Sequence, residues 1–219
     1  MIYVTTELGM QLDLPCFEDD AIDDLLRSLP AHAVISVRGI PGSGKTVFAE
    51  YLIAAALSAG ETTRVALLGP DALGQEFLNQ ATGVGTDLLT ALPRGRLALE
   101  VLNNPTLQDL CCTVSNFPEV DLFVVDSLDE LPSNEGEESD RILSWLVGQA
   151  DTSLITIGES AVGSSRTYAD LVVDFEQLSG DEDFWYADSV LTIERPATSQ
   201  RETRAFRIEG YSIQLWEAQ

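Results

Sequence analysis

A glycine-rich stretch near the start of the chain has the residue types and spacing that bind phosphate. Residues 39–46 read Gly-Ile-Pro-Gly-Ser-Gly-Lys-Thr and satisfy the pattern G-x-x-x-x-G-K-[ST]. In such a loop the backbone N–H groups turn inward around the β-phosphate, the lysine contacts the β and γ oxygens, and the hydroxyl ligates Mg²⁺. The pattern predicts an ATP site formed by Gly39, Pro41, Gly42, Ser43, Gly44, Lys45 and Thr46, in which Lys45 also stabilises the transferred phosphate.

Two features favour a nucleotide site over a glycine-rich turn without function. The loop lies between a predicted strand at 33–37 and a predicted apolar helix at 47–59, which is the strand-to-helix setting that the motif requires. The helix would add the positive end of its dipole to the anion site. Lys45 is also the only lysine in the chain, since every other basic side chain is an arginine or His32.

A carboxylate far along the chain is the candidate partner of this loop. Residues 122–126 form an apolar run that ends in Asp126. P-loop proteins keep at this place an acidic residue that holds the Mg²⁺ ion. We therefore predict that Thr46 and Asp126 bind Mg²⁺. Ser127 rather than a glutamate follows, so a catalytic base must come from elsewhere.

The elements that must position these residues alternate between strand and helix. Apolar runs predict strands at 33–37, 64–69, 96–101, 122–126 and 153–158, and helical patterns occupy 18–26, 47–59, 73–81, 107–114 and 141–149. Such alternation predicts an α/β fold with a mostly parallel sheet. After Ala169 the chain reads as four strands without helices, at 171–175, 189–194, 203–208 and 211–215, which predicts an antiparallel C-terminal extension. We expect one domain over 1–219, with its core at about 17–216.

Several segments resemble single-domain members of the KaiC/RadA branch of the RecA-like ATPases. The resemblance lies in the loop, in residues 64–68, 85–88, 94–97 and 124–128, and in the closing strands at 168–172 and 191–208. It implies a RecA-like three-layer sandwich, Mg²⁺-ATP as ligand, and nucleotide sites shared between subunits of a homo-oligomer.

The resemblance also shows where this chain departs from the family. KaiC-like proteins activate the attacking water with two glutamates after the second strand, and the matching stretch here is Gly69-Pro70-Asp71-Ala72. Asp71 is one methylene shorter, which predicts slow hydrolysis. Glu159, at the end of the strand 153–158, is a second candidate, with a solvated loop carboxylate as the alternative.

A further departure concerns the contact between subunits. The family places a Lys-x-Arg pair in its closing strands that reaches the neighbouring subunit's phosphate, and the matching residues here are Ile193, Glu194 and Arg195. Only the arginine is kept. Arg195 is therefore the candidate arginine finger in trans, with an exposed structural arginine as the alternative.

Charge argues against nucleic acid as a partner. The chain has 36 acidic and 12 basic residues, a net charge of −24. The loops with which recombinases hold single-stranded DNA correspond to 129–140, which is strongly acidic, and 160–167, which offers only Arg166. Such acidity, almost without lysine, predicts a halophilic protein adapted to molar salt, and a basic protein partner is the alternative.

The remaining composition predicts a soluble, cytoplasmic protein. No apolar run reaches the roughly 18 residues of a membrane span. Three cysteines, two of them adjacent at Cys111 and Cys112, do not suggest a disulfide scaffold. The favoured function is a slow KaiC-like ATPase that acts as a regulatory switch. The alternatives are an ATP-gated interaction module with vestigial hydrolysis and, third, a DNA recombination or repair ATPase.

Overall fold

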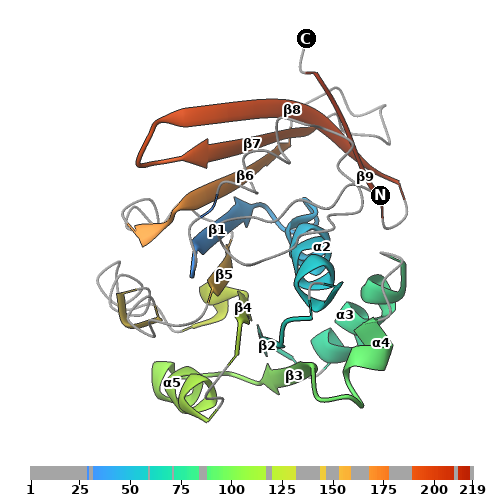
Figure 1. Ribbon diagram of the computed structural model, residues 1–219, viewed down its shortest axis with the longest axis vertical. Helices are drawn as coiled ribbons and strands as arrows, with labels where there is room; N and C mark the ends of the chain where they lie inside the picture. Colours follow the sequence, from blue (N-terminus) through green and yellow to red (C-terminus); the bar gives the residue numbers. More distant parts are fainter. Residues whose placement is uncertain are drawn as a thin grey trace.

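A single mixed sheet organises the part of the chain that the structure describes. The computed structural model describes residues 29, 32–58, 60–70, 72–83, 88–116, 120–131, 144–146, 153–158, 168–177, 189–209 and 212–217. Within these ranges nine strands pair in the order β3-β2-β4-β5-β1-β6-β7-β8-β9 (Figure 1). The helix predicted at 18–26, and all but residues 144–146 of the helix predicted at 141–149, lie outside the described residues.

The parallel part of the sheet contains the strands that the sequence predicts. It consists of β1 (Val34–Gly39), β2 (Thr63–Leu68), β3 (Leu97–Leu102), β4 (Leu122–Asp126), β5 (Ser153–Gly158) and β6 (Leu171–Gln177). Strands β1, β2, β4 and β5 are buried along most of their length, as expected for parallel strands covered on both faces. The predicted α/β fold with a mostly parallel sheet is confirmed.

The C-terminal strands extend this sheet in antiparallel fashion, with one correction. Strands β7 (Ser189–Arg195), β8 (Gln200–Glu209) and β9 (Ser212–Glu217) are antiparallel as predicted, and Glu209 pairs with Ser212 across the β8–β9 turn. β6, by contrast, pairs parallel with β1. It lies on the opposite side of β1 from β5, so it joins the sheet as one more parallel strand rather than as the first strand of the extension.

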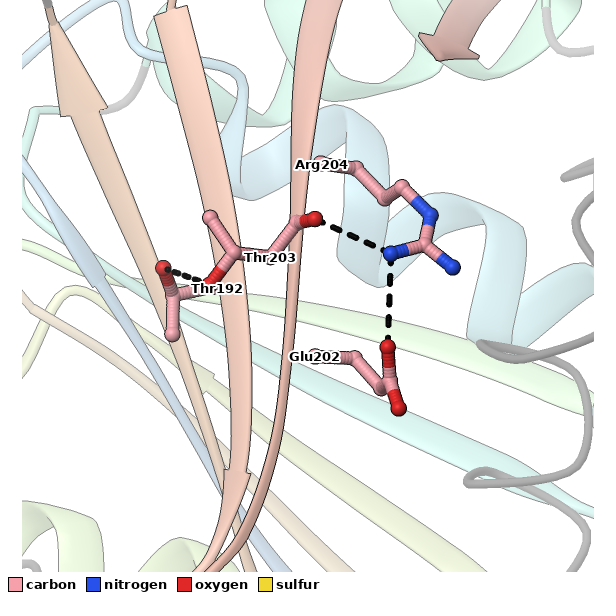
Figure 2. A network of polar contacts seen from close by, with 4 residues as sticks. All are labelled: Thr192, Glu202, Thr203 and Arg204. Carbon is pink, nitrogen blue, oxygen red and sulfur yellow. Dashed lines mark hydrogen bonds and ion pairs between the residues drawn. The ribbon is translucent and has the colours of Figure 1, made fainter. Parts of the chain in front are cut away.

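Polar side chains contact one another in the extension. Thr192 on β7 and Thr203 on β8 are register partners whose hydroxyls lie 3.3 Å apart (Figure 2). A cross-strand pair of this kind stabilises neighbouring strands by a few tenths of a kcal/mol to about 1 kcal/mol. Within β8, Arg204 donates from Nη1 to Glu202 at 3.3 Å and to the Thr203 carbonyl oxygen at 3.0 Å (Figure 2). The extension thus adds polar contacts to its strand pairing.

Helices cover both faces of the sheet and complete three layers. α2 (Lys45–Ser58), α3 (Ala72–Gly83) and α4 (Leu88–Ala91) lie on one face, and α5 (Leu107–Ser115) lies on the other (Figure 1). Each face has its own apolar cluster, with Phe48 fully buried on the α2 face and Leu110 on the α5 face. Neither α4 nor the 3₁₀ turn η1 (Leu128–Glu130) was predicted, because a single turn shows no periodicity.

Candidate nucleotide site

The glycine-rich loop joins β1 to α2 in a conformation that excludes a side chain at its first position. Gly39 has a φ of +148°, and a Cβ placed there would lie 2.6 Å from Ser43 Oγ and 2.7 Å from the Phe175 carbonyl oxygen. Gly44, directly before α2, has a φ of +101°. The Ser43 hydroxyl is buried here without a hydrogen-bond partner among the described residues. An unsatisfied buried hydroxyl in a backbone cradle fits the phosphates of a nucleotide.

Lys45 lies against this loop as the first residue of α2. Its Nζ donates to the carbonyl oxygens of Gly39 at 2.6 Å and of Ile40 at 2.8 Å, and the side chain is almost fully buried. The ammonium is thereby held at the N-terminal end of a 14-residue helix, where the helix dipole adds positive potential. Positive potential at the place that an anion would occupy therefore comes from both the Lys45 ammonium and the helix dipole.

Thr46 and Asp126, the predicted Mg²⁺ ligands, lie in direct contact. The Thr46 hydroxyl donates to Asp126 Oδ2 at 2.9 Å, although the two residues are 80 positions apart in the sequence. The contact forms because α2 packs on the face of β4 that carries Asp126. Among the described residues no group of three or more His, Cys, Asp or Glu side chains could hold a metal. Mg²⁺ usually takes one or two protein ligands and completes its shell with phosphate and water.

The protonation of Asp126 reflects opposing influences. Burial raises its pKa above the ordinary value, while the Thr46 hydrogen bond and the Lys45 charge lower it and the nearby Asp129 raises it. Asp129 accepts a hydrogen bond from Ser127 Oγ at 2.9 Å, and its Oδ2 lies 3.1 Å from the position a Cβ on Gly158 would take. A divalent cation would relieve this accumulation of negative charge.

A second carboxylate, Glu50 on α2, lies close enough to Asp126 on β4 for their charges to interact. Burial, and then the charge of Asp126, raise the pKa of Glu50 to about 8. Its side chain is 0% exposed, and both carboxylate oxygens lack a hydrogen-bond partner among the described residues. Glu50 was not among the predicted site residues. Its spacing of four from Thr46, which places both on one helix face, was the signal available in the sequence.

Beside the Thr46–Asp126 pair lies a cavity of about 200 Å³. Apolar side chains of β2 and α3 form part of its wall, and Glu76 of α3 and Glu130 of η1 supply carboxylates. The side chain of Glu130 passes over Gly69, at the end of β2, and its Cγ lies 3.9 Å from the position that a Cβ on Gly69 would take. Sequence reasoning missed both glutamates, because only the packing of α3 and η1 brings them to the carboxyl ends of β2 and β4.

The described structure leaves two of the other predicted catalytic residues as predictions and places the third. Asp71 and Glu159 lie outside the described residues. Arg195 ends β7, one residue beyond the pair Val172–Glu194. It therefore lies near the start of β6, whereas Gly39 pairs with Phe175 further along that strand. Arg195 is thus displaced along the sheet from its own glycine-rich loop.

Comparisons with known proteins identify the fold. The sequence matches no protein-family model and no curated protein sequence. The structure is similar to the flagellar accessory protein FlaH from Methanocaldococcus jannaschii, with a TM-score of 0.69 and 16% identity over 94% of this chain and 98% of that one. A KaiC-like protein from Pyrococcus horikoshii OT3 gives a TM-score of 0.68 and 19% identity over 94% and 97%. The fold is that of the RecA-like, KaiC-type P-loop proteins.

The KaiC-type fold accounts for the arrangement of the site. Its parallel strands end together at one edge of the sheet, and the loop after β1 and the carboxylate that ends β4 meet there. None of the described helices is both long and apolar enough to cross a membrane.

Proposed function

We propose that this protein binds Mg²⁺-ATP, hydrolyses it slowly and acts as a nucleotide-dependent regulatory switch. The observation that carries the proposal is the Thr46–Asp126 hydrogen bond at the foot of a glycine-rich loop that also holds Lys45. Three side chains with the chemistry of phosphate and magnesium binding thus converge from two distant segments. The KaiC-type fold supports nucleotide binding in general.

Each residue has a defined part in this proposal. The loop N–H groups and the start of α2 bind the β-phosphate, and Lys45 adds positive charge beside the β and γ oxygens. Thr46, through its hydroxyl, and Asp126, through its carboxylate, would hold the Mg²⁺ ion. When bound, Mg²⁺ neutralises charge that develops on the phosphates.

Slow turnover follows from the weak provision for activating water. Asp71 and Glu159 stay candidates for this task, and we add Glu130 and Glu76 because both line the cavity beside the metal pair. The carboxylates of Glu130 and Glu76 are held by no hydrogen bond to a described residue, and both residues are exposed. A base that is not held in place loses much of its catalytic effect.

That observation also favours a second function, an ATP-gated interaction module with vestigial hydrolysis. In both versions we propose a homo-oligomer in which Arg195 reaches the phosphate of a neighbouring subunit. Arg195 is displaced along the sheet from its own glycine-rich loop, which suits a contact in trans.

Phosphate release in high salt separates the two versions. Wild type should release phosphate faster than Lys45→Ala, and Asp71→Ala or Glu130→Gln should lower the rate if that side chain orients the water. Single-stranded DNA should not stimulate the reaction. Turnover of wild type no greater than that of Lys45→Ala, with ATP still bound, would leave only the interaction module.

A further inference from the structure

The middle of α2 holds a carboxylate that the proposed nucleotide chemistry does not yet use. Glu50 lies between Ala49 and Tyr51, in a helix whose other buried residues are almost all apolar. It is 0% exposed, and neither carboxylate oxygen has a hydrogen-bond partner among the described residues. A buried polar group without partners costs folding free energy. Nothing within the described fold compensates for this cost.

The helix geometry directs Glu50 toward the proposed metal position. Residues four apart lie on the same helix face, and Cα–Cβ bonds tilt toward the N-terminus, so Glu50 extends along the face that carries Thr46. Thr46 itself contacts Asp126 at 2.9 Å. The charge of Asp126 is one of the two influences on Glu50, which places the two carboxyl groups within electrostatic range of each other. The unpartnered carboxyl group therefore shares with Thr46 the face of α2 that contacts Asp126.

The chemistry of Mg²⁺ supplies the missing partners. Mg²⁺ keeps several water molecules when it binds between phosphate and protein, and each of these carries protons that need acceptors. Glu50 lies one helical turn further along α2 than Thr46, the residue that contacts Asp126 directly. A carboxylate one layer behind the ligands suits the second coordination shell, where such acceptors orient bound water.

We propose that Glu50 is a positioning residue of the metal site, accepting hydrogen bonds from water bound to Mg²⁺ in the nucleotide-loaded protein. The inference rests on the proposed Mg²⁺-ATP binding and deepens it. The proposal has two opposite consequences. Glu50 lowers the stability of the metal-free protein, and it raises the affinity of the protein for metal. A carboxylate with a purely structural role would not strengthen metal binding.

Two substitutions at this position test both consequences. Glu50→Gln keeps an acceptor oxygen but removes the ionisable carboxyl group. Glu50→Met has a similar volume but neither an acceptor oxygen nor an ionisable group. We expect the affinity for Mn²⁺, read by electron paramagnetic resonance with a non-hydrolysable ATP analogue bound, to fall about 10-fold in Glu50→Gln and further in Glu50→Met. In metal-free buffer, Glu50→Met should shift the urea midpoint upward. Glu100→Gln and Glu100→Met, on the half-buried β3 residue, control for loss of an acid elsewhere.

Each outcome decides the matter. Mn²⁺ affinity unchanged in both Glu50 variants, or a lower urea midpoint or loss of folding in Glu50→Met without metal, would overturn the proposal. Equal effects in the Glu100 variants would also overturn it. If wild type fails to bind the nucleotide analogue with Mn²⁺, the proposed function itself is wrong, which distinguishes the two failures.

Discussion

At the scale of single residues, some side chains of the site could be predicted from a contiguous motif, whereas others come together only through the fold. Lys45 and Thr46 were predictable because the motif encodes their geometry, and Asp126 because a buried strand ends in it. The Thr46–Asp126 contact then brings the two predicted metal ligands together. Glu76 and Glu130 could not be predicted, because their nearness to Asp126 depends on how α3 and η1 pack.

One carboxyl away from the site should make stability depend on pH. Burial, and then the charge of Asp121, raise the pKa of Glu61 to about 7 in the folded protein, above its ordinary value of 4.5. The folded state therefore binds more protons than the unfolded state between about pH 4.5 and 7, so the free energy of unfolding falls as the pH rises through this window.

Glu61→Gln removes this linkage. We expect the stability of Glu61→Gln relative to wild type to increase from pH 4.5 to pH 7 and then to level off, as measured by urea unfolding at each pH. Glu100→Gln corrects for the general loss of one negative charge. A stability difference that does not change with pH would contradict the assigned cause.

At the scale of elements, the alternation of apolar strands and helices was enough to predict the parallel sheet. It was not enough to predict the direction of β6, because a strand pattern does not say which neighbour it joins. The one-turn elements α4 and η1 were missed for want of periodicity. η1 matters for function, since it carries Asp129 and Glu130 to the edge of the sheet where the site lies.

The junction between β1 and the loop should tolerate no side chain. Gly39→Ala combines a positive φ with contacts of 2.6 and 2.7 Å to Ser43 Oγ and the Phe175 carbonyl oxygen. Gly60→Ala, after α2, is the matched control, because its φ is +96° but no atom lies within 4 Å of the new Cβ. We expect Gly60→Ala to cost about 1–2 kcal/mol, the strain of the left-handed conformation, and Gly39→Ala clearly more. Equal urea midpoints for the two variants would show that the loop relaxes around the methyl group.

At the scale of the whole molecule, charge should govern stability as much as packing does. A net charge of −24 on 219 residues repels itself in dilute buffer, and salt shortens the range of that repulsion from about 10 Å at 0.1 M to about 3 Å at 1 M. We predict that the free energy of unfolding rises steadily with KCl up to molar concentration. Sucrose, which carries no charge, provides the control for exclusion of solute from the surface. Full stability in dilute buffer, without a further rise in KCl, would contradict the halophilic interpretation.

The same charge should make the proposed nucleotide binding depend on metal. ATP is itself an anion. Asp126 lies beside the Thr46 end of the loop with Asp129 close enough for their charges to interact, while Lys45 is the one lysine that can oppose them. Without a divalent cation the acidic groups should exclude ATP. With Mg²⁺ bound between phosphate and Asp126, they should hold it.

Calorimetric titration of ATP into wild type and Lys45→Ala, with Mg²⁺ and with a chelator, tests this account most directly. The account predicts binding by wild type only when Mg²⁺ is present, and an affinity about 10- to 100-fold lower in Lys45→Ala, the equivalent of one or two lost charge-assisted hydrogen bonds. No binding by wild type, or equal affinity in Lys45→Ala, would contradict the central claim that this loop is a Mg²⁺-ATP site.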